Sequence, residues 1–225
     1  WAGGRATQRS LVDRAIASLG YCALVGPTPV LEAIERCRQL LEEAKGNRKP
    51  EALLEGALSH LEAMRGNVDE SRRLYRDSRA MLEELGWTFL AAMTSFDSAP
   101  VEILAGDLEA AEAELRRDYD TLERMGETNY ISTTAALLAE VLFRQGDFDG
   151  ADECTRICEE LAARDDVVSQ FRWRSVRAKI LASRGRFAEA ETLAREAVAL
   201  IRRSDVLNSQ AETSLALNVS ELLVE

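Results

Sequence analysis

The sequence predicts an all-α fold built as a stack of antiparallel helix pairs, and three observations carry that prediction. The first is composition: 46% of the 225 residues are hydrophobic and 30% charged, only 6% are aromatic, and there are four prolines. Such a composition is typical of long amphipathic helices. The second is a repeat of about 40 residues along the chain. The third is a glycine at the same place in each repeat.

Four segments define the repeat and place a turn in each copy. They are GNVDES at Gly66, GDLEAA at Gly106, GDFDGA at Gly146 and GRFAEA at Gly185, separated by 40, 40 and 39 residues. Each glycine follows an apolar helical run and can adopt the left-handed conformation that ends a helix. The acidic residues behind the glycines suit the first turn of a helix. Each segment therefore predicts a tight turn between two antiparallel helices.

Small residues recur in step with the glycines on both sides of the turn. Seven residues before each glycine lie Ser59, Ala99, Ala139 and Ala178, and five residues after it lie Ser71, Ala111, Ala151 and Ala190. Small side chains at facing positions allow two helix backbones to approach closely. These positions predict the contact line of each helical hairpin.

The pattern predicts about eleven helices along the chain. They cover about 7–20, 29–45, 50–65, 68–85, 88–105, 108–125, 129–145, 148–163, 167–184, 187–203 and 207–224. Pro29 suits a first helical turn. Pro100 lies inside the helix predicted at 88–105 and is expected to kink it, because proline removes a hydrogen bond at a cost of about 3 kcal/mol.

The glycine, the aromatic residue and the alanine of the third segment, Gly146, Phe148 and Ala151, resemble the tetratricopeptide repeat consensus, which also has a small residue seven before the glycine. The resemblance is clear over residues 50–203. The period exceeds the usual 34 or so residues, and Asp118 stands where the consensus has Ala. The resemblance implies one array, a right-handed superhelical solenoid. Its expected parts are a degenerate pair at 1–49, four units at 50–86, 87–126, 127–166 and 167–206, and a final helix at 207–225.

The helix endings LEELG (Leu82–Gly86) and LERMG (Leu122–Gly126) and the stretch 172–200 are similar to a particular group of such arrays. These arrays end large actinobacterial regulators in which a nucleotide cyclase or DNA-binding domain precedes an ATPase module; maltose-regulator-like transcription factors share that plan. The resemblance implies a sensing or protein-docking arm. Because Trp1 is not a natural start and the final helix lacks a Gly or Pro terminator, both ends are expected to be cuts inside a longer protein.

Charge and composition exclude several classes of function. A net charge of -11 and a pI near 4.8 disfavour a general nucleic-acid or membrane-surface role. No apolar run approaches the roughly 20 residues of a membrane helix. The four cysteines form no disulfide framework, so they are expected to be reduced and the protein cytoplasmic. No phosphate-binding glycine loop occurs, and we expect no enzyme and no cofactor.

The residues that could bind a metal have a simpler interpretation. Cys154 and Cys158 are spaced to share one helix face, but His60, the single histidine, lies two repeats away. The two cysteines are therefore expected to be small packing residues. His60 either has a structural role or lines a binding surface.

The first helix of each pair in such an array faces the concave surface, and consensus offsets from the glycines identify the exposed positions there. The candidate partner-binding residues are His60, Met93, Phe96, Thr133, Glu140, Arg144, Arg172, Ser175 and Lys179. The groove is expected to be apolar in its first half and polar in its second. Between Asp166 and Glu189 the chain carries six basic residues and no acid, so an acidic peptide or a phosphate-bearing ligand could dock there.

A purely structural interpretation of the same charges stays open. Glu140 and Lys179 occupy equivalent positions on adjacent repeats and could pair with each other, and Arg177 falls at a usually buried position where it would need its own carboxylate partner. The first functional hypothesis is a scaffold that holds a protein, a peptide or another domain of the same parent protein. The alternative is a small-ligand sensor that gates an upstream ATPase, cyclase or DNA-binding module, with its pocket near Trp87 and Phe96. Open array ends also favour a homodimer.

Overall fold

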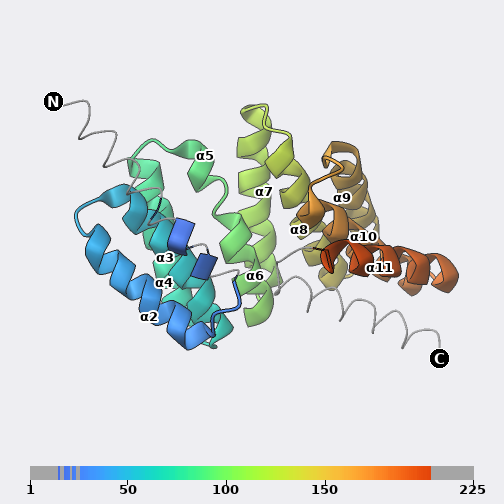
Figure 1. The fold of residues 1–225 in the computed structure, drawn as a ribbon. Coiled ribbons are helices and arrows are strands. Elements are labelled where there is room, and N and C mark those ends of the chain that lie inside the picture. The colour runs from blue at the N-terminus through green and yellow to red at the C-terminus, as the bar shows by residue number, and fades with distance from the viewer. Residues whose placement is uncertain (1–14, 16–17, 21, 24–25, 204–225) are drawn as a thin grey trace. The chain divides into compact units, whose positions relative to one another are not determined.

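The structure is a computed structural model that describes residues 15, 18–20, 22–23 and 26–203, and over these residues it is all-helical (Figure 1). Its helices are α2 (Val30–Ala44), α3 (Arg48–Met64), α4 (Val68–Glu84), α5 (Thr88–Ala91), α6 (Ser95–Ala105), α7 (Leu108–Arg124), α8 (Asn129–Gln145), α9 (Phe148–Leu161), α10 (Val167–Ser183) and α11 (Phe187–Ile201). The predicted all-α fold is confirmed. The final predicted helix, 207–224, lies outside the described residues, as does most of 7–20. None of the described helices is both long enough and apolar enough to cross a membrane.

The chain divides into two compact units, residues 1–106 and residues 107–225, which we call the first and the second unit. In the first unit α3 packs against α2, α4 and α6, and α4 also contacts α5 and α6. In the second unit α8 packs against α7, α9 and α10, and α10 also contacts α9 and α11. The helices α3, α8 and α10 therefore each contact their hairpin partner and also helices of a neighbouring pair, as stacked helix pairs do.

The turns between paired helices have the predicted glycine geometry. Gly146 ends α8 with a φ of 87°, and the N–H of Asp147 donates to the carbonyl of Leu142 over 2.9 Å. Asp147 then begins α9, because its carboxylate accepts a hydrogen bond from the Gly150 N–H at 3.0 Å. One terminal carbonyl of α8 and one of the first N–H groups of α9 thereby find hydrogen-bond partners within the turn.

The small residues that flank each turn are buried, and in the pairs α3–α4, α8–α9 and α10–α11 they lie on helices that pack against each other, as predicted. The eight predicted positions are fully buried or nearly so: Ser59, Ala99, Ala139, Ala178, Ser71, Ala111, Ala151 and Ala190. Where both facing residues are serines, the Ser59 hydroxyl donates to the Ser71 carbonyl over 2.9 Å. Leucines fill the core around these residues, with Leu54 and Leu61 fully buried in the first unit and Leu115 and Leu122 in the second. Each contributes about 1.5–3 kcal/mol through burial.

The expectation of one helix over 88–105, kinked by Pro100, is wrong. The helix is interrupted at residues 92–94, and Pro100 lies inside α6. The cause is the Ala91 carbonyl, which accepts hydrogen bonds from the Thr94 N–H (3.2 Å), the Thr94 hydroxyl (2.7 Å) and the Arg79 guanidinium (2.9 Å). A carbonyl satisfied in this way no longer needs the helical bond from Ser95, so the chain turns there.

Candidate functional site

In the second unit, the packing of α8 on α10 brings three of the predicted partner-binding residues together. Lys179 Nζ lies 2.8 Å from Glu140 Oε2, and Arg144 Nε donates to Glu140 Oε1 over 2.7 Å. Lys179 and Glu140 come from successive repeats, so their pairing joins one helix pair to the next. The structural interpretation, in which Glu140 and Lys179 pair with each other, is confirmed.

The Glu140 carboxylate is shared between two cations and stays ionised. Burial acts to raise the pKa of Glu140, but the charge and hydrogen bond of Lys179, together with those of Arg144, outweigh it and hold the pKa below its ordinary value. One carboxylate therefore faces two cations, and the group carries a net positive charge. The Lys179 ammonium also lies 5.8 Å from the centroid of the Phe143 ring.

The other predicted residues of this surface differ in how far they are engaged. The Thr133 hydroxyl lies 2.8 Å from the Ser169 hydroxyl, so it bridges α8 and α10. Ser175 is buried and donates to the carbonyl of Phe171 over 2.9 Å. Arg172 is half-buried, with its guanidinium carbon 5.4 Å from the Phe171 ring centroid. The Ser175 hydroxyl is therefore used in a hydrogen bond within α10, whereas Arg172 and Thr133 remain partly exposed.

In the first unit, the predicted residues lie on α3 and around the break before α6. His60 Nδ1 lies 3.6 Å from Asp97 Oδ1, and both side chains are largely buried. Met93 lies in the break itself and Phe96 in the first turn of α6; both are half-buried. Because α3 packs against α6, His60 and Asp97 form a polar contact between neighbouring helix pairs.

The two cysteines of α9 are packing residues, as predicted. Cys158 is fully buried and its thiol contacts the Ser169 carbonyl at 3.6 Å, while Cys154 is 9% exposed. Burial raises the pKa of Cys154 to about 11 and that of Cys158 to about 12, so both stay as neutral thiols. Among the described residues, no group of His, Cys, Asp and Glu is placed to hold a metal ion.

A groove on another side of α10 was not predicted. It has a volume of about 770 Å³ and is lined by α9, α10 and α11. Because five arginines line it, we call it the arginine groove: Arg156, Arg174, Arg177, Arg184 and Arg186. The consensus offsets identify only positions on the concave face, so they do not include the arginines of the groove. The sequence signal that could have identified them is the arginine spacing around Trp173.

Trp173 forms part of the groove wall and is almost fully buried. The guanidinium carbons of Arg174 and Arg177 lie 4.2 Å and 4.5 Å from its ring centroid, and its indole N–H donates to Gln170 Oε1 over 3.2 Å. Stacking of this kind is worth about 0.5–2 kcal/mol per cation. The indole therefore orients two of the five guanidiniums.

Both stacked arginines also have carboxylate partners on neighbouring helices. Arg177 donates to the Thr155 hydroxyl over 3.0 Å and pairs with Glu159 of α9. Arg174 Nε lies 3.3 Å from Glu196 of α11. The expectation that Arg177 needs a carboxylate of its own is confirmed.

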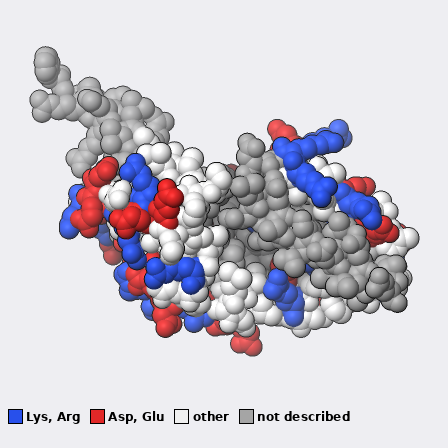
Figure 2. All heavy atoms as spheres, turned by 60° about the horizontal axis from the view of Figure 1, so that its bottom comes forward, with Lys and Arg blue, Asp and Glu red and all other residues white. Residues whose placement is uncertain are grey.

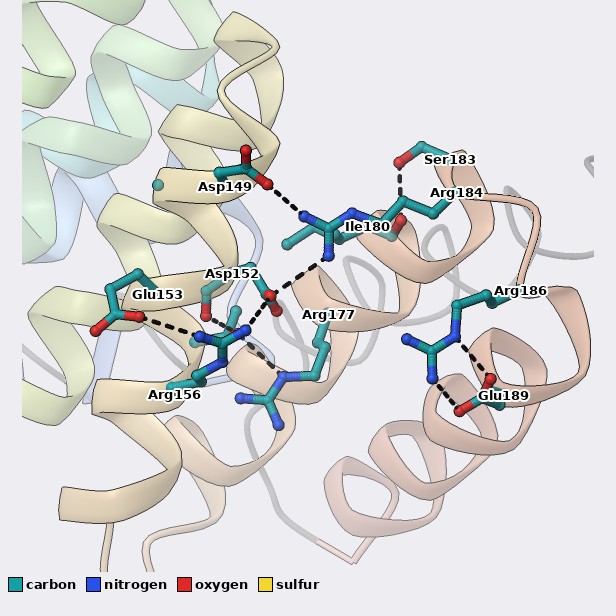
Figure 3. Close-up of polar contacts among 12 residues, drawn as sticks. Asp149, Asp152, Glu153, Arg156, Arg177, Ile180, Ser183, Arg184, Arg186 and Glu189 are labelled. Carbon is teal, nitrogen blue, oxygen red and sulfur yellow. Dashed lines mark hydrogen bonds and ion pairs between the residues drawn. The ribbon is translucent and has the colours of Figure 1, made fainter.

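Beside the groove, ion pairs link the end of α10 to α9 and continue along α9 (Figure 3). Arg184 reaches Asp149 at 2.7 Å and Asp152 at 3.4 Å. Asp152 also accepts from Arg156 at 2.7 Å, and Arg156 contacts Glu153 at 3.3 Å. On the face drawn in Figure 2, basic and acidic side chains are likewise interspersed. Most of the basic residues between 172 and 186 therefore have acidic neighbours.

Comparison with known proteins supports repeats of the tetratricopeptide type. Two tetratricopeptide repeat models match the chain, one at residues 133–156 and one at 173–204. These stretches begin within α8 and α10, the first helices of the last two pairs. The chain thus contains tetratricopeptide-type repeats in its second unit. No curated protein sequence matches the chain.

Among solved structures, the chain is similar in fold to a Rap protein complexed with competence and sporulation factor. The TM-score is 0.65 at 14% sequence identity, over 94% of this chain and 65% of that one. At this identity the likeness shows the fold alone, a solenoid of tetratricopeptide-type helix pairs. The chain spans less than two thirds of the length of the Rap protein that it matches.

Proposed function

We propose that this chain is a non-catalytic protein-interaction module, the docking arm of a larger bacterial signalling or transcriptional regulator. Its partner is a protein segment or another domain of the same parent protein. In the second unit the partner contacts the surface of α8 and α10 around Arg144, Arg172 and Lys179. The apolar residues Met93 and Phe96 provide a separate contact in the first unit.

The observation that carries this proposal is the arrangement of two cations around Glu140. Lys179 and Arg144 come from different repeats and share one carboxylate, which leaves a net positive charge at positions where such repeats face a partner. Arg172 lies seven residues before Lys179, about two turns away on the same face of α10. Carboxylates of a partner would form charge-assisted hydrogen bonds with these groups. An acidic segment is therefore the expected ligand of this surface.

The comparisons support the proposal at the level of fold. Tetratricopeptide-type arrays expose long concave surfaces that suit extended partners. The Rap protein was solved in complex with competence and sporulation factor, so a solenoid of similar fold holds a separate molecule. The resemblance of the sequence to the terminal arrays of actinobacterial regulators supports a role in which this arm serves a domain elsewhere in the parent protein.

A peptide selection on the immobilised chain tests the proposal. We expect enrichment of peptides rich in Asp and Glu, and about tenfold weaker binding after the double change Arg144→Glu with Lys179→Gln, because charge-assisted contacts are lost. Arg116→Glu with Arg124→Gln makes the same charge change on α7 and serves as the control. Arg116 pairs with Glu112 one turn earlier as Arg144 pairs with Glu140. Equal loss in both double variants, or enrichment without acidic residues, would contradict the proposal.

The second candidate function is a small-ligand sensor, and the break between α5 and α6 is the observation that favours it. Phe96 lies just after the break, and Trp87 lies just before α5 under the ammonium of Lys49, 4.1 Å from the ring centroid. A thermal-shift screen of metabolites tests this function, since a ligand at 100 times its Kd adds about 2.7 kcal/mol. The stabilisation should disappear in Phe96→Ala. A broad panel without a stabiliser would count against a sensor.

A further inference from the structure

We propose that the arginine groove is a second interaction surface, which binds a protein segment carrying consecutive Asp and Glu residues. The proposal is independent of the surface around Lys179, because the two surfaces occupy different sides of α10. Arg177 precedes Lys179 by two residues, which places their side chains about 200° apart around the helix. Arg177 pairs with Glu159 of α9, whereas Lys179 pairs with Glu140 of α8.

The size of the groove suits a short peptide segment. Its volume of about 770 Å³ is comparable with that of pockets that hold ligands, roughly 300–1,000 Å³. Figure 3 shows Arg156, Arg177 and Arg184 on the side formed by α9 and α10, with Arg186 and Glu189 across from them on the α11 side. A segment lying between these walls would have cations on both sides.

Two ion pairs in the groove have a largely buried arginine and an exposed carboxylate. Arg174 and Arg177 are 20% and 18% exposed, whereas their partners Glu196 and Glu159 are 54% and 49% exposed. The guanidiniums of Arg174 and Arg177 thus lie deeper than their glutamate partners, which lie at the rim. Ion pairs with such exposed carboxylates contribute little, about 0–1 kcal/mol each. A partner carboxylate can therefore replace a rim glutamate, which turns outward into solvent.

The deep guanidiniums select for carboxylates. An arginine stays charged at every physiological pH and offers paired N–H donors that match a carboxylate. Trp173 and Thr155 hold the guanidinium of Arg177 in place, which reduces the entropy lost on binding. The groove is lined by five arginines and four carboxylates, in a protein whose net charge is -11. It is thus a locally cationic site on a protein that repels nucleic acid overall.

Binding of a fluorescein-labelled oligoglutamate peptide to the full chain, followed by anisotropy at low salt, tests the proposal. We expect saturable binding that becomes about tenfold weaker in the double variant Arg156→Glu with Arg186→Glu, as charge-assisted contacts are lost. These two side chains are 63% and 53% exposed, and each pairs with carboxylates three or four residues away in the sequence, so their replacement should leave the fold intact. Far-UV circular dichroism checks this.

A matched control separates the groove from general electrostatics. Arg116→Glu with Arg195→Glu makes the same charge change at side chains that are 54% and 58% exposed, paired within their own helices and outside the groove. This variant should bind the peptide within about twofold of the wild-type affinity. Equal weakening in both double variants would overturn the proposal, as would an absence of binding by the wild-type chain.

Removal of a rim carboxylate gives an opposite and more specific signal. Glu159→Gln and Glu196→Gln should each strengthen peptide binding severalfold. The carboxylates of the peptide then no longer compete with these glutamates for Arg177 and Arg174. Glu191→Gln, on α11 but outside the groove, should leave binding unchanged. The same loss of about tenfold on Arg156→Glu with Arg186→Glu is expected in the Arg144→Glu, Lys179→Gln background, which lacks the contact with an acidic segment proposed on α8; this comparison distinguishes the groove from that surface. Preferential binding of a single-stranded oligonucleotide over the peptide at the same salt would refute the choice of ligand.

Discussion

Ionisation of Glu55 lowers the stability of the first unit in a pH-dependent way. Glu55 lies on α3 and is half-buried, and its Oε2 has no hydrogen-bond partner among the described residues. Burial and the negative charge of Asp77 raise the pKa of Glu55 to about 7, with a smaller contribution from Glu51, although Arg73 acts in the opposite direction. Folding therefore favours the protonated form of this carboxyl group.

The sign and size of the effect follow from the two pKa values. The unfolded chain has the ordinary value of 4.5, and the folded value is about 7. A raised folded pKa contributes stability that is fully present below pH 4.5 and is lost as the pH rises through 7. At about 1.4 kcal/mol for each pKa unit the full cost at pH 8 is about 3 kcal/mol, and the partial exposure of the side chain reduces it to roughly 1–3 kcal/mol.

The substitution Glu55→Gln removes the charge and should remove this cost. We expect the free energy of unfolding at pH 8 to rise by about 1–3 kcal/mol, and the gain to shrink severalfold at pH 5, where Glu55 is already protonated in the folded state. Urea unfolding followed by circular dichroism measures both values. The exposed Glu43→Gln on α2 is the control and should show no such pH dependence. A Glu55→Gln variant with the same gain at both pH values, or none at pH 8, would refute the reasoning.

Three further predictions concern the turn, the core and the thiols. Gly146→Ala should cost about 1–2 kcal/mol by urea unfolding, because a φ of 87° strains an L side chain even though a Cβ there meets no atom within 4 Å; an unchanged midpoint would exclude this strain. Leu115→Ala should cost about 2–5 kcal/mol, since Leu115 is fully buried, and a loss below 1 kcal/mol or so would mean that the site collapses around the cavity. In thiol titration with a disulfide reagent, the exposed Cys22 should react at once, whereas Cys158, whose pKa burial raises to about 12, should react only on unfolding; fast reaction of Cys158 would contradict its placement.

The repeat made most of the fold predictable, because its signals are local. A glycine that ends one helix and an aspartate that begins the next fix a turn within a few residues, as at Gly146 and Asp147. The predicted helix at 129–145 has the same bounds as α8, and its neighbours on both sides differ by one or two residues at their ends. The small residues on either side of each turn then determine which faces meet.

The break before α6 could not be predicted in this way, because its cause is tertiary. The Ala91 carbonyl is satisfied partly by Arg79, which comes from α4 and is 12 residues away in the chain. Pro100 was the only local irregularity in that stretch of sequence, so the kink was predicted there. The break lies elsewhere because a side chain from another helix supplies the competing hydrogen bond.

The candidate site shows why a run of charges along the sequence gives an incomplete prediction. The basic residues from 172 to 186 look continuous in the sequence, but α10 distributes them around its axis at about 100° per residue. Lys179 faces Glu140, whereas Arg177 and Arg184 face acids of α9. The first pairing spans one repeat and could be derived from the period. The pairings of Arg177 and Arg184 could not be derived in this way, because these residues lie on a face that the repeat consensus does not describe. One basic run therefore contributes to two separate surfaces. An assay with variants of only one surface would miss the other.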